Sequence, residues 1–314
     1  MLIFPIKNKY YNCFDANIIS ISTSKNRDYC FLFSNYFYFG YFKKGNRIIS
    51  ENIQEFIDKK EDIFHTYHGV ERIKTKYKNK DHMLEKIREY IDNETPVMIK
   101  SDVFYCSWNV LYNVQHINHF FLIIGYTEKK IICLDPYFTT EQIIIDEDDL
   151  FFPKNDCFYT FRIKDIPNIS KNDAIDLMIE GLSEYNNIDI FSHFQLFKQD
   201  IRNINYDIEL SESKSIYTIP LIRALKSIEY NRRCYIELLA YIGKRFGIYI
   251  GNMIMEMEEL CNSWSRFRIM LLKCLLKKTI EQKYENIENV INEIYRKECY
   301  LVNELYNYFS KAGV

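Results

Sequence analysis

Residues 96–136 read PVMIKSDVFYCSWNVLYNVQHINHFFLIIGYTEKKIICLDP, and this stretch holds the clearest strand pattern of the chain. The run HFFLIIGY begins at His119, and KIICL ends one residue before Asp135. A turn near residues 127–129 would join the two runs as an antiparallel hairpin, which places His119 beside Asp135. A histidine oriented by an aspartate is the base half of a Cys-His-Asp site. The sequence therefore predicts such a pair on a β-hairpin.

The nucleophile for this pair is predicted to be Cys13, far upstream. Asn12 can cap a helix that begins at or just after Cys13. A thiol in the first turn of a helix lies near unpaired backbone N–H groups and the positive end of the helix dipole, and both stabilise a thiolate. The alternative is a small buried cysteine without a chemical role, as most free cysteines are. The His119–Asp135 pair is what distinguishes Cys13 from the other cysteines.

Other histidines compete with this interpretation. His116 lies in the loop before the strand, where it would contact substrate or solvent, and His119 could instead be a structural histidine. His65 and His68 form a metal-like HTYH pair. Zinc needs three or four ligands, and no matching cluster stands out in the sequence. We therefore expect no metal.

The composition limits the class of protein. The chain has 314 residues, of which 47% are hydrophobic, so it can form one large or two ordinary domains with a buried core. Its net charge of −2 argues against nucleic acid as the main partner. Nine cysteines without a CxxC pair fit reduced thiols. No apolar run approaches the ~18 residues of a membrane span, and no signal segment is recognised. We expect a cytoplasmic protein that does not enter a membrane.

The pattern changes near residue 165 and predicts an α+β fold in two parts. Residues 1–165 are rich in short β-type runs and would form a mixed domain with an antiparallel sheet. Residues 170–314 would be helical throughout, and Ser170 is a plausible N-cap. The segment IPNISKND, residues 166–173, is the best linker candidate. The β-type runs are 31–42, 96–100, 119–126, 130–138 and 157–164, and the helices are 18–23, 81–91, 171–186, 190–203, 217–246, 249–281 (with a break near Trp264) and 284–311.

These features together carry a family resemblance. The order of Cys13, PVMIKSDVFY, HFFLIIGY and CLDP resembles the N-terminal domain of the butirosin-biosynthesis acyltransferase family. That family is a papain-like relative of the cysteine peptidases that process bacteriocin leaders. Its Asp-x-x-Tyr motif matches Asp102 and Tyr105. The helical segments 231–243, 259–271 and 294–305 follow its looser C-terminal pattern, so the likeness covers nearly the whole chain, with sharp motifs only between residues 11 and 137.

The resemblance implies an enzyme with a Cys13 nucleophile, a His119 general base and an orienting Asp135. Residues 1–165 would then be a papain-like catalytic domain, and residues 170–314 a helical domain that completes the substrate groove. The implied activity transfers an acyl or peptidyl group from a carrier-protein phosphopantetheine thioester to a small amine or diamine, within antibiotic or nonribosomal peptide assembly. No cofactor is expected beyond the phosphopantetheine that the substrate carries. Candidate substrate-binding residues are Asn12, Asp102, Tyr105, Trp108, Tyr112 and His116; the aromatic ones could equally be loop packing.

One departure from papain-like peptidases concerns the oxyanion hole. Such enzymes often have a glutamine six residues before the cysteine, where this chain has Lys7. Asn8, Asn12 or the backbone N–H of Cys13 would have to replace that donor. The difference weakens a peptide-cleaving role, but a peptidase or thioesterase with the same triad stays open. A non-catalytic carrier-binding module is a third hypothesis.

A basic run between Arg72 and Lys80 is a candidate docking patch for an acidic carrier protein. Lys74, Lys76 and Lys78 complete the run. The alternative is a solvated charged face.

Overall fold

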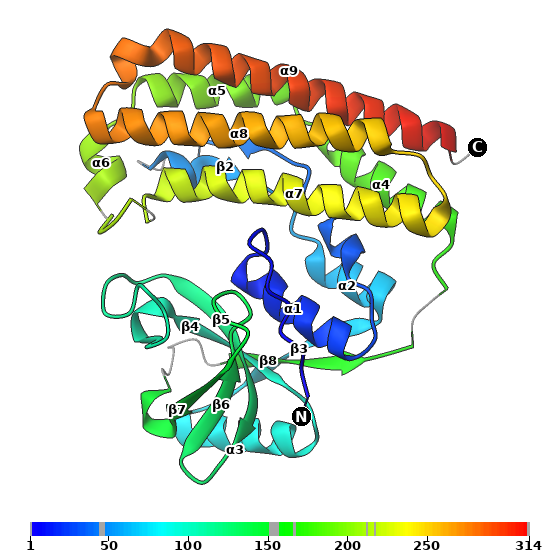
Figure 1. Ribbon diagram of the computed structural model, residues 1–314, viewed down its shortest axis with the longest axis vertical. Coiled ribbons are helices and arrows are strands. Elements are labelled where there is room, and N and C mark those ends of the chain that lie inside the picture. Colours follow the sequence, from blue (N-terminus) through cyan, green and yellow to red (C-terminus); the bar gives the residue numbers. More distant parts are fainter. Residues whose placement is uncertain are drawn as a thin grey trace. The chain divides into compact units, whose positions relative to one another are not determined.

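The computed structural model describes residues 2–43, 48–150, 157–165, 168–211, 213–216 and 218–312. The chain forms two compact units (Figure 1). We call Met1–Phe31 with Lys60–Pro167 the β unit, and Leu32–Lys59 with Asn168–Val314 the helical unit. The segment 32–59 therefore groups with the helices, although the sequence placed it inside a 1–165 domain.

The β unit is built on a six-stranded antiparallel sheet with strand order β3-β8-β4-β5-β6-β7. The pairing of β5 with β6 aligns Leu122 with Leu134, and β4 aligns Ser101 with His119. The strands are β3 (Val70–Lys76), β4 (Val97–Asp102), β5 (Asn118–Tyr126), β6 (Lys130–Leu134), β7 (Gln142–Asp146) and β8 (Cys157–Ile163).

Helices cover both faces of this sheet. α3 (Lys80–Asp92) packs Met83, Leu84 and Ile87 into a core that includes Phe121 of β5. α1 (Cys13–Ser24) also contacts β5, where the rings of Phe14 and Phe120 lie 5.5 Å apart. Because neighbouring residues of a strand point to opposite faces, α1 and α3 lie on opposite sides of β5. α2 (Lys60–His68) contacts β3.

Short 3₁₀ helices and turns connect these elements. Gly69 joins α2 to β3 with a φ of +64°, and a Cβ there would lie 2.9 Å from the carbonyl oxygen of Lys164, so only glycine fits. The 3₁₀ segments of the chain are η1 (Cys30–Phe33), η2 (Ile49–Asn52), η3 (Val103–Tyr105) and η4 (Glu147–Asp149).

The helical unit is dominated by three long helices that run side by side, α7 against α8 and α8 against α9 (Figure 1). Ser170 caps α4 in a reciprocal capping box with Asp173, which satisfies two backbone N–H groups. The helices are α4 (Lys171–Asn186), α5 (Ile190–Arg202), α6 (Tyr206–Ser211), α7 (Pro220–Phe246), α8 (Gly251–Lys277) and α9 (Ile280–Ala312), and the short strands are β1 (Gly40–Tyr41) and β2 (Ile53–Gln54).

A fully buried ion pair ties the segment 32–59 to the long helices. Arg232 of α7 pairs with Glu298 of α9 at 3.0 Å. The same guanidinium donates to the carbonyl oxygens of Tyr36 and Tyr38, each at 2.9 Å, and Trp264 donates to Glu298 at 2.8 Å. Every charged group in this buried cluster therefore has partners, as burial of an ion pair requires.

Several predictions of local structure are confirmed. The hairpin β5–β6, the strands β4 and β8, and helices α1, α3, α4, α5, α7, α8 and α9 lie where the sequence placed them, with ends shifted by a few residues. The first residue of the predicted helix 217–246 and the first two of the predicted linker lie outside the described residues. No break interrupts α8 at Trp264.

One prediction of local structure is wrong, and several elements were not predicted. Residues 31–42 were expected to be a β-type run, but only Gly40–Tyr41 is a strand, because aromatic β-propensity yields to packing against helices. The ring of Phe39, for example, lies 4.6 Å from that of Phe194 in α5. The basic run overlaps the edge strand β3, which the sequence pattern did not predict. Helices α2 and α6 and strand β7 were not predicted either.

Among the described residues, no helix combines the length and apolarity that crossing a membrane requires.

Candidate active site

Cys13 is the first residue of α1 and is partly accessible. Asn12 caps the helix: its side-chain oxygen accepts from the N–H of Asp15 at 2.9 Å, and its amide donates to the Asp15 carboxylate at 2.7 Å. The thiol is thus held at the positive end of a capped helix. Of the other eight cysteines, only Cys299 is partly accessible.

His119 and Asp135 meet at the end of the β5–β6 hairpin. The His119 ring nitrogen Nε2 lies 2.7 Å from Oδ2 of Asp135, and both side chains are buried. The indole N–H of Trp108 donates to the same oxygen at 2.8 Å. Two contacts therefore hold the carboxylate, and Nε2 is engaged with it, which leaves Nδ1 as the nitrogen that can face a nucleophile.

The environment of His119 raises its pKa to about 9. Burial by itself would lower this pKa, but hydrogen bonding and electrostatic attraction to Asp135 and Cys13 outweigh it. The ring of His119 therefore interacts with both Asp135 and Cys13. The structure brings the three predicted triad residues together from α1, β5 and the end of β6.

Lys7, at the position of the usual oxyanion-hole glutamine, and the three predicted replacement donors make different contacts. The Lys7 ammonium donates to the carbonyl oxygen of Phe138 at 2.5 Å, and the side chain of Asn12 serves the helix cap. Asn8 accepts from the N–H of Tyr10 through its side-chain oxygen. The first N–H groups of a helix lack intrahelical acceptors, so the N–H of Cys13 is the best placed of the donors considered.

Asp102 organises the loop before β5. One oxygen of its carboxylate accepts from the N–H groups of Phe104 and Ile117, each at 3.0 Å, and the other lies 2.8 Å from Nδ1 of His116. His116 stacks on Phe104 with ring centroids 4.2 Å apart, yet 63% of its side chain is exposed. His116 thus pairs with Asp102, whereas His119 pairs with Asp135.

Three predicted aromatic residues, Tyr105, Trp108 and Tyr112, line a cavity of about 570 Å³. No triad residue lines this cavity. Trp108 connects the cavity to the triad, because its side chain lines the cavity and its indole N–H donates to Asp135. Asp102, His116 and Asn12 are not part of the lining.

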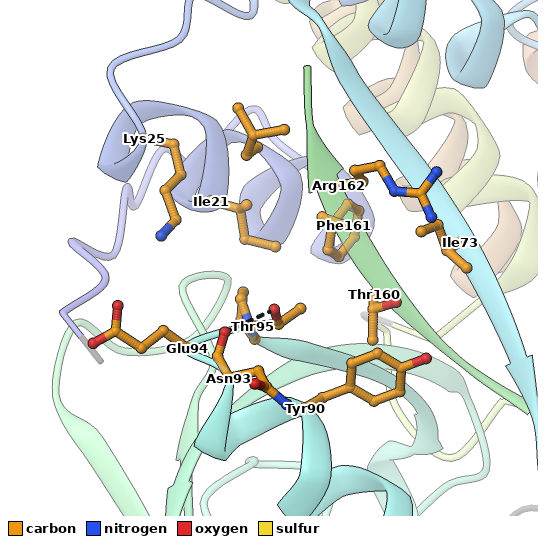
Figure 2. Close-up of a pocket in the computed structure, with 12 residues that line it drawn as sticks. Ile21, Lys25, Ile73, Tyr90, Asn93, Glu94, Thr95, Thr160, Phe161 and Arg162 are labelled. Carbon is orange, nitrogen blue, oxygen red and sulfur yellow. Dashed lines mark hydrogen bonds between the residues drawn. The ribbon is translucent and has the colours of Figure 1, made fainter. Parts of the chain in front are cut away.

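A second cavity, of about 510 Å³, lies where the sheet opens between β4 and β8 (Figure 2). These strands are paired only at Met98 and Tyr159, and Pro96 has no N–H with which to continue the ladder. Ile21 and Lys25 border this cavity near the end of α1, while Cys13 begins that helix. It is therefore separate from the triad.

Two further predictions concern charged residues. No group of three or more histidine, cysteine or acidic side chains within the described ranges could hold a metal ion. His65 lies 3.1 Å from the Lys164 ammonium, and His68 packs against Phe64.

In the basic run, the predicted docking patch, Arg72 is paired with Glu61, and Lys80 donates to the backbone carbonyl oxygen of Asp148 at 3.3 Å.

The sequence did not indicate two features of this site. Lys60, at the start of α2, is buried and lies 3.0 Å from Asp15 in the first turn of α1. The ring of Phe138 lies 5.2 Å from that of His119. Phe138 lies two residues after the Asp135-Pro136 step, and this position is a local signal for a place near His119. The pairing of Lys60 with Asp15 joins residues far apart in the chain and leaves no local signal.

One protein-family model matches part of the chain. Residues 41–156 match the Peptidase_C39 like family. The matched range contains His119 and Asp135 and begins after Cys13. No curated protein matches the chain. The match supports a papain-like cysteine peptidase type of family and agrees with the observed α+β fold, which has an antiparallel sheet and a helical C-terminal region.

Proposed function

We propose that this protein is a cysteine acyltransferase. It moves an acyl or peptidyl group from a carrier-protein phosphopantetheine thioester to a small amine and forms an amide, in nonribosomal peptide or antibiotic assembly. The observation that carries the proposal is the buried His119–Asp135 pair, which interacts with a partly accessible Cys13 at a helix N-terminus. Within the butirosin-type family that it resembles, the chain is most reminiscent of the amide-forming enzyme of closthioamide assembly, a polythioamide pathway.

The first half-reaction forms a thioester on Cys13. Because its raised pKa keeps His119 protonated at neutral pH, the thiolate of Cys13 is stabilised beside an imidazolium. The thiolate attacks the carbonyl carbon, and the N–H of Cys13 donates to the developing oxyanion. The bond to the pantetheine sulfur breaks, and that sulfur leaves with the proton from His119. One thioester replaces another, so this step is close to thermoneutral.

The second half-reaction forms the amide. His119, now neutral, takes a proton from the amine nitrogen as that nitrogen attacks the acyl-Cys13 carbonyl. The bond to Cys13 breaks, the cysteine leaves as a thiolate, and the imidazolium is restored. Asp135 and Trp108 keep the ring oriented throughout. Exposed Lys74, Lys76 and Lys78 remain available for docking an acidic carrier.

Hydrolysis by the same three residues is the alternative function. Water is the competing nucleophile for acyl-Cys13, and only a bound, oriented amine with a high effective concentration can outcompete it. A peptidase or thioesterase would lack such an amine site. The distinction therefore lies in the products.

The test is to incubate the protein with a carrier-bound or small-molecule acyl thioester and to follow the intact mass. We expect the acyl mass on Cys13, and discharge as an amide when a suitable primary amine is added. Cys13→Ala is the control: it should retain the fold and gain no mass. Acid as the dominant product with every amine tried, together with cleavage of an ordinary peptide, would favour the hydrolase. An unmodified wild-type protein would favour a non-catalytic module.

A further inference from the structure

Asn17 is a fully buried polar residue of α1, one turn after Cys13. Its side-chain nitrogen Nδ2 makes two contacts with backbone carbonyl oxygens. One is the oxygen of Cys13 at 2.7 Å, and the other is the oxygen of Phe120 at 2.8 Å. Phe120 follows His119 in β5. A single amide nitrogen therefore links the residue that bears the thiol to the strand that bears the imidazole.

The orientation of the Asn17 amide follows from its partners. Both partners are carbonyl oxygens, which only accept hydrogen bonds, so the NH₂ group must face them and supply both protons. The opposite orientation would place three oxygens together. As a result Oδ1 points elsewhere, and it has no hydrogen-bond donor in the part of the chain that the structure describes. A buried acceptor without a donor is unfavourable, so the double contact has to outweigh that cost.

The position of Phe120 explains why its carbonyl accepts from a side chain. The pairing of β5 with β6 ends at Leu122 and Leu134. Continuing this register by two residues would place Pro136 opposite Phe120, and proline has no N–H to donate. The Asp135-Pro136 step thus turns the chain away at the place where Asp135 reaches His119. Asn17 contacts the strand at this point.

We propose that Asn17 is a positioning residue that sets the distance between the sulfur of Cys13 and the ring of His119. Apart from the interaction of Cys13 with His119 itself, α1 packs on β5 through apolar contacts such as Phe14 with Phe120, which have no directional preference and allow sliding. The two directional hydrogen bonds of Asn17 fix the first turn of α1 against the start of β5. This inference rests on the proposed role of the Cys13–His119 pair but not on the identity of the acyl group or the acceptor.

The test measures alkylation of Cys13 by iodoacetamide as a function of pH, with peptide mapping to separate Cys13 from the other cysteines. The variants are Asn17→Leu, which removes both donors and the unpaired oxygen, and Asn17→Asp, which has the same shape but presents oxygens. In both we expect the rate constant at pH 6 to fall at least ~10-fold. The pH profile should move toward that of an ordinary thiol, near ~8.5.

Ser20→Ala is the matched control. Ser20 is equally buried on the same helix, and its hydroxyl donates to the carbonyl oxygen of Ala16 at 2.7 Å and accepts from the N–H of Ile6 at 2.9 Å, so neither of these hydrogen bonds reaches β5. The Ser20 variant should lower thermal stability while the pH profile of Cys13 stays as in the wild type. A residue with only a structural role would behave in this way.

The outcomes separate the two proposals. Rapid alkylation at pH 6 in the wild type and in both folded Asn17 variants would overturn the role of Asn17 and leave the proposed function standing. Slow alkylation in the wild type would instead contradict the activated Cys13–His119 pair. Failure of both Asn17 variants to fold would make Asn17 a structural residue and would also overturn the inference.

Discussion

At the scale of single residues, two histidines three positions apart have different environments. His119 is buried and bonded to Asp135, whereas His116 is exposed and bonded to Asp102. We expect His119→Ala to lose ~10⁴-fold or more in turnover, as triad variants do. His116→Ala should change the apparent affinity for substrate more than the chemical step. Steady-state kinetics with a small acyl thioester would measure both, and the reverse order of effects would contradict the assignment of the base.

The raised pKa of His119 predicts a pH dependence of stability. A group whose pKa is higher in the folded state, here about 9 against 6.5, stabilises the fold fully below pH ~6.5. This contribution is lost as the pH rises through about 9. We expect Asp135→Asn, which removes the hydrogen bond that raises the pKa, to be less stable than the wild type.

Thermal midpoints of the wild type and Asp135→Asn across this range would test that expectation. Their difference should be largest near pH 6 and should narrow above about pH 9. A difference that grows with pH would show that the pKa of His119 is lowered rather than raised by its surroundings.

At the scale of elements, α4 approaches the segment 32–59 closely at Gly181. A Cβ at this position would lie 2.8 Å from the backbone oxygen of Ser34, which cannot move aside as a flexible side chain can. We expect Gly181→Ala to destabilise the protein by ~1–3 kcal/mol through overpacking. Gly251→Ala is the matched control, because the nearest atoms to its Cβ would be those of the Tyr249 side chain at 3.6 Å, an ordinary van der Waals distance. Equal thermal midpoints for the two variants would contradict the close contact.

Local sequence signals predicted most elements near the triad and most long helices. Asn12 and Ser170 cap helices as expected, and the apolar stripe of α3 packs on the sheet. The strand β3 was missed because its alternation is carried by charged residues, which read as a basic run. For residues 31–42 a strand was predicted where the chain is mostly not a strand, since aromatic residues suit a strand and a helical core equally well.

At the scale of the whole molecule, the two units do not follow the order of the sequence. Residues 32–59 belong to the helical unit, where Arg232 holds the carbonyl oxygens of Tyr36 and Tyr38. We expect a fragment of residues 1–165 to be aggregation-prone, because its segment 32–59 would expose aromatic side chains. Co-expression with residues 168–314 should give a fragment complex that copurifies. A monomeric 1–165 fragment with a cooperative thermal transition would contradict this prediction.

Local patterns in the amino-acid sequence predict the hairpin that pairs His119 with Asp135, because strand alternation and a short turn fix that register locally. They also predict the capped start of α1 at Cys13, since a capping residue acts within its own first turn. Other contacts are visible only in the folded chain: Lys60 is buried against Asp15, Asn17 links Cys13 to Phe120, and residues 32–59 group with the helices. These contacts join residues far apart in the chain, and their energies depend on burial, which no local pattern encodes.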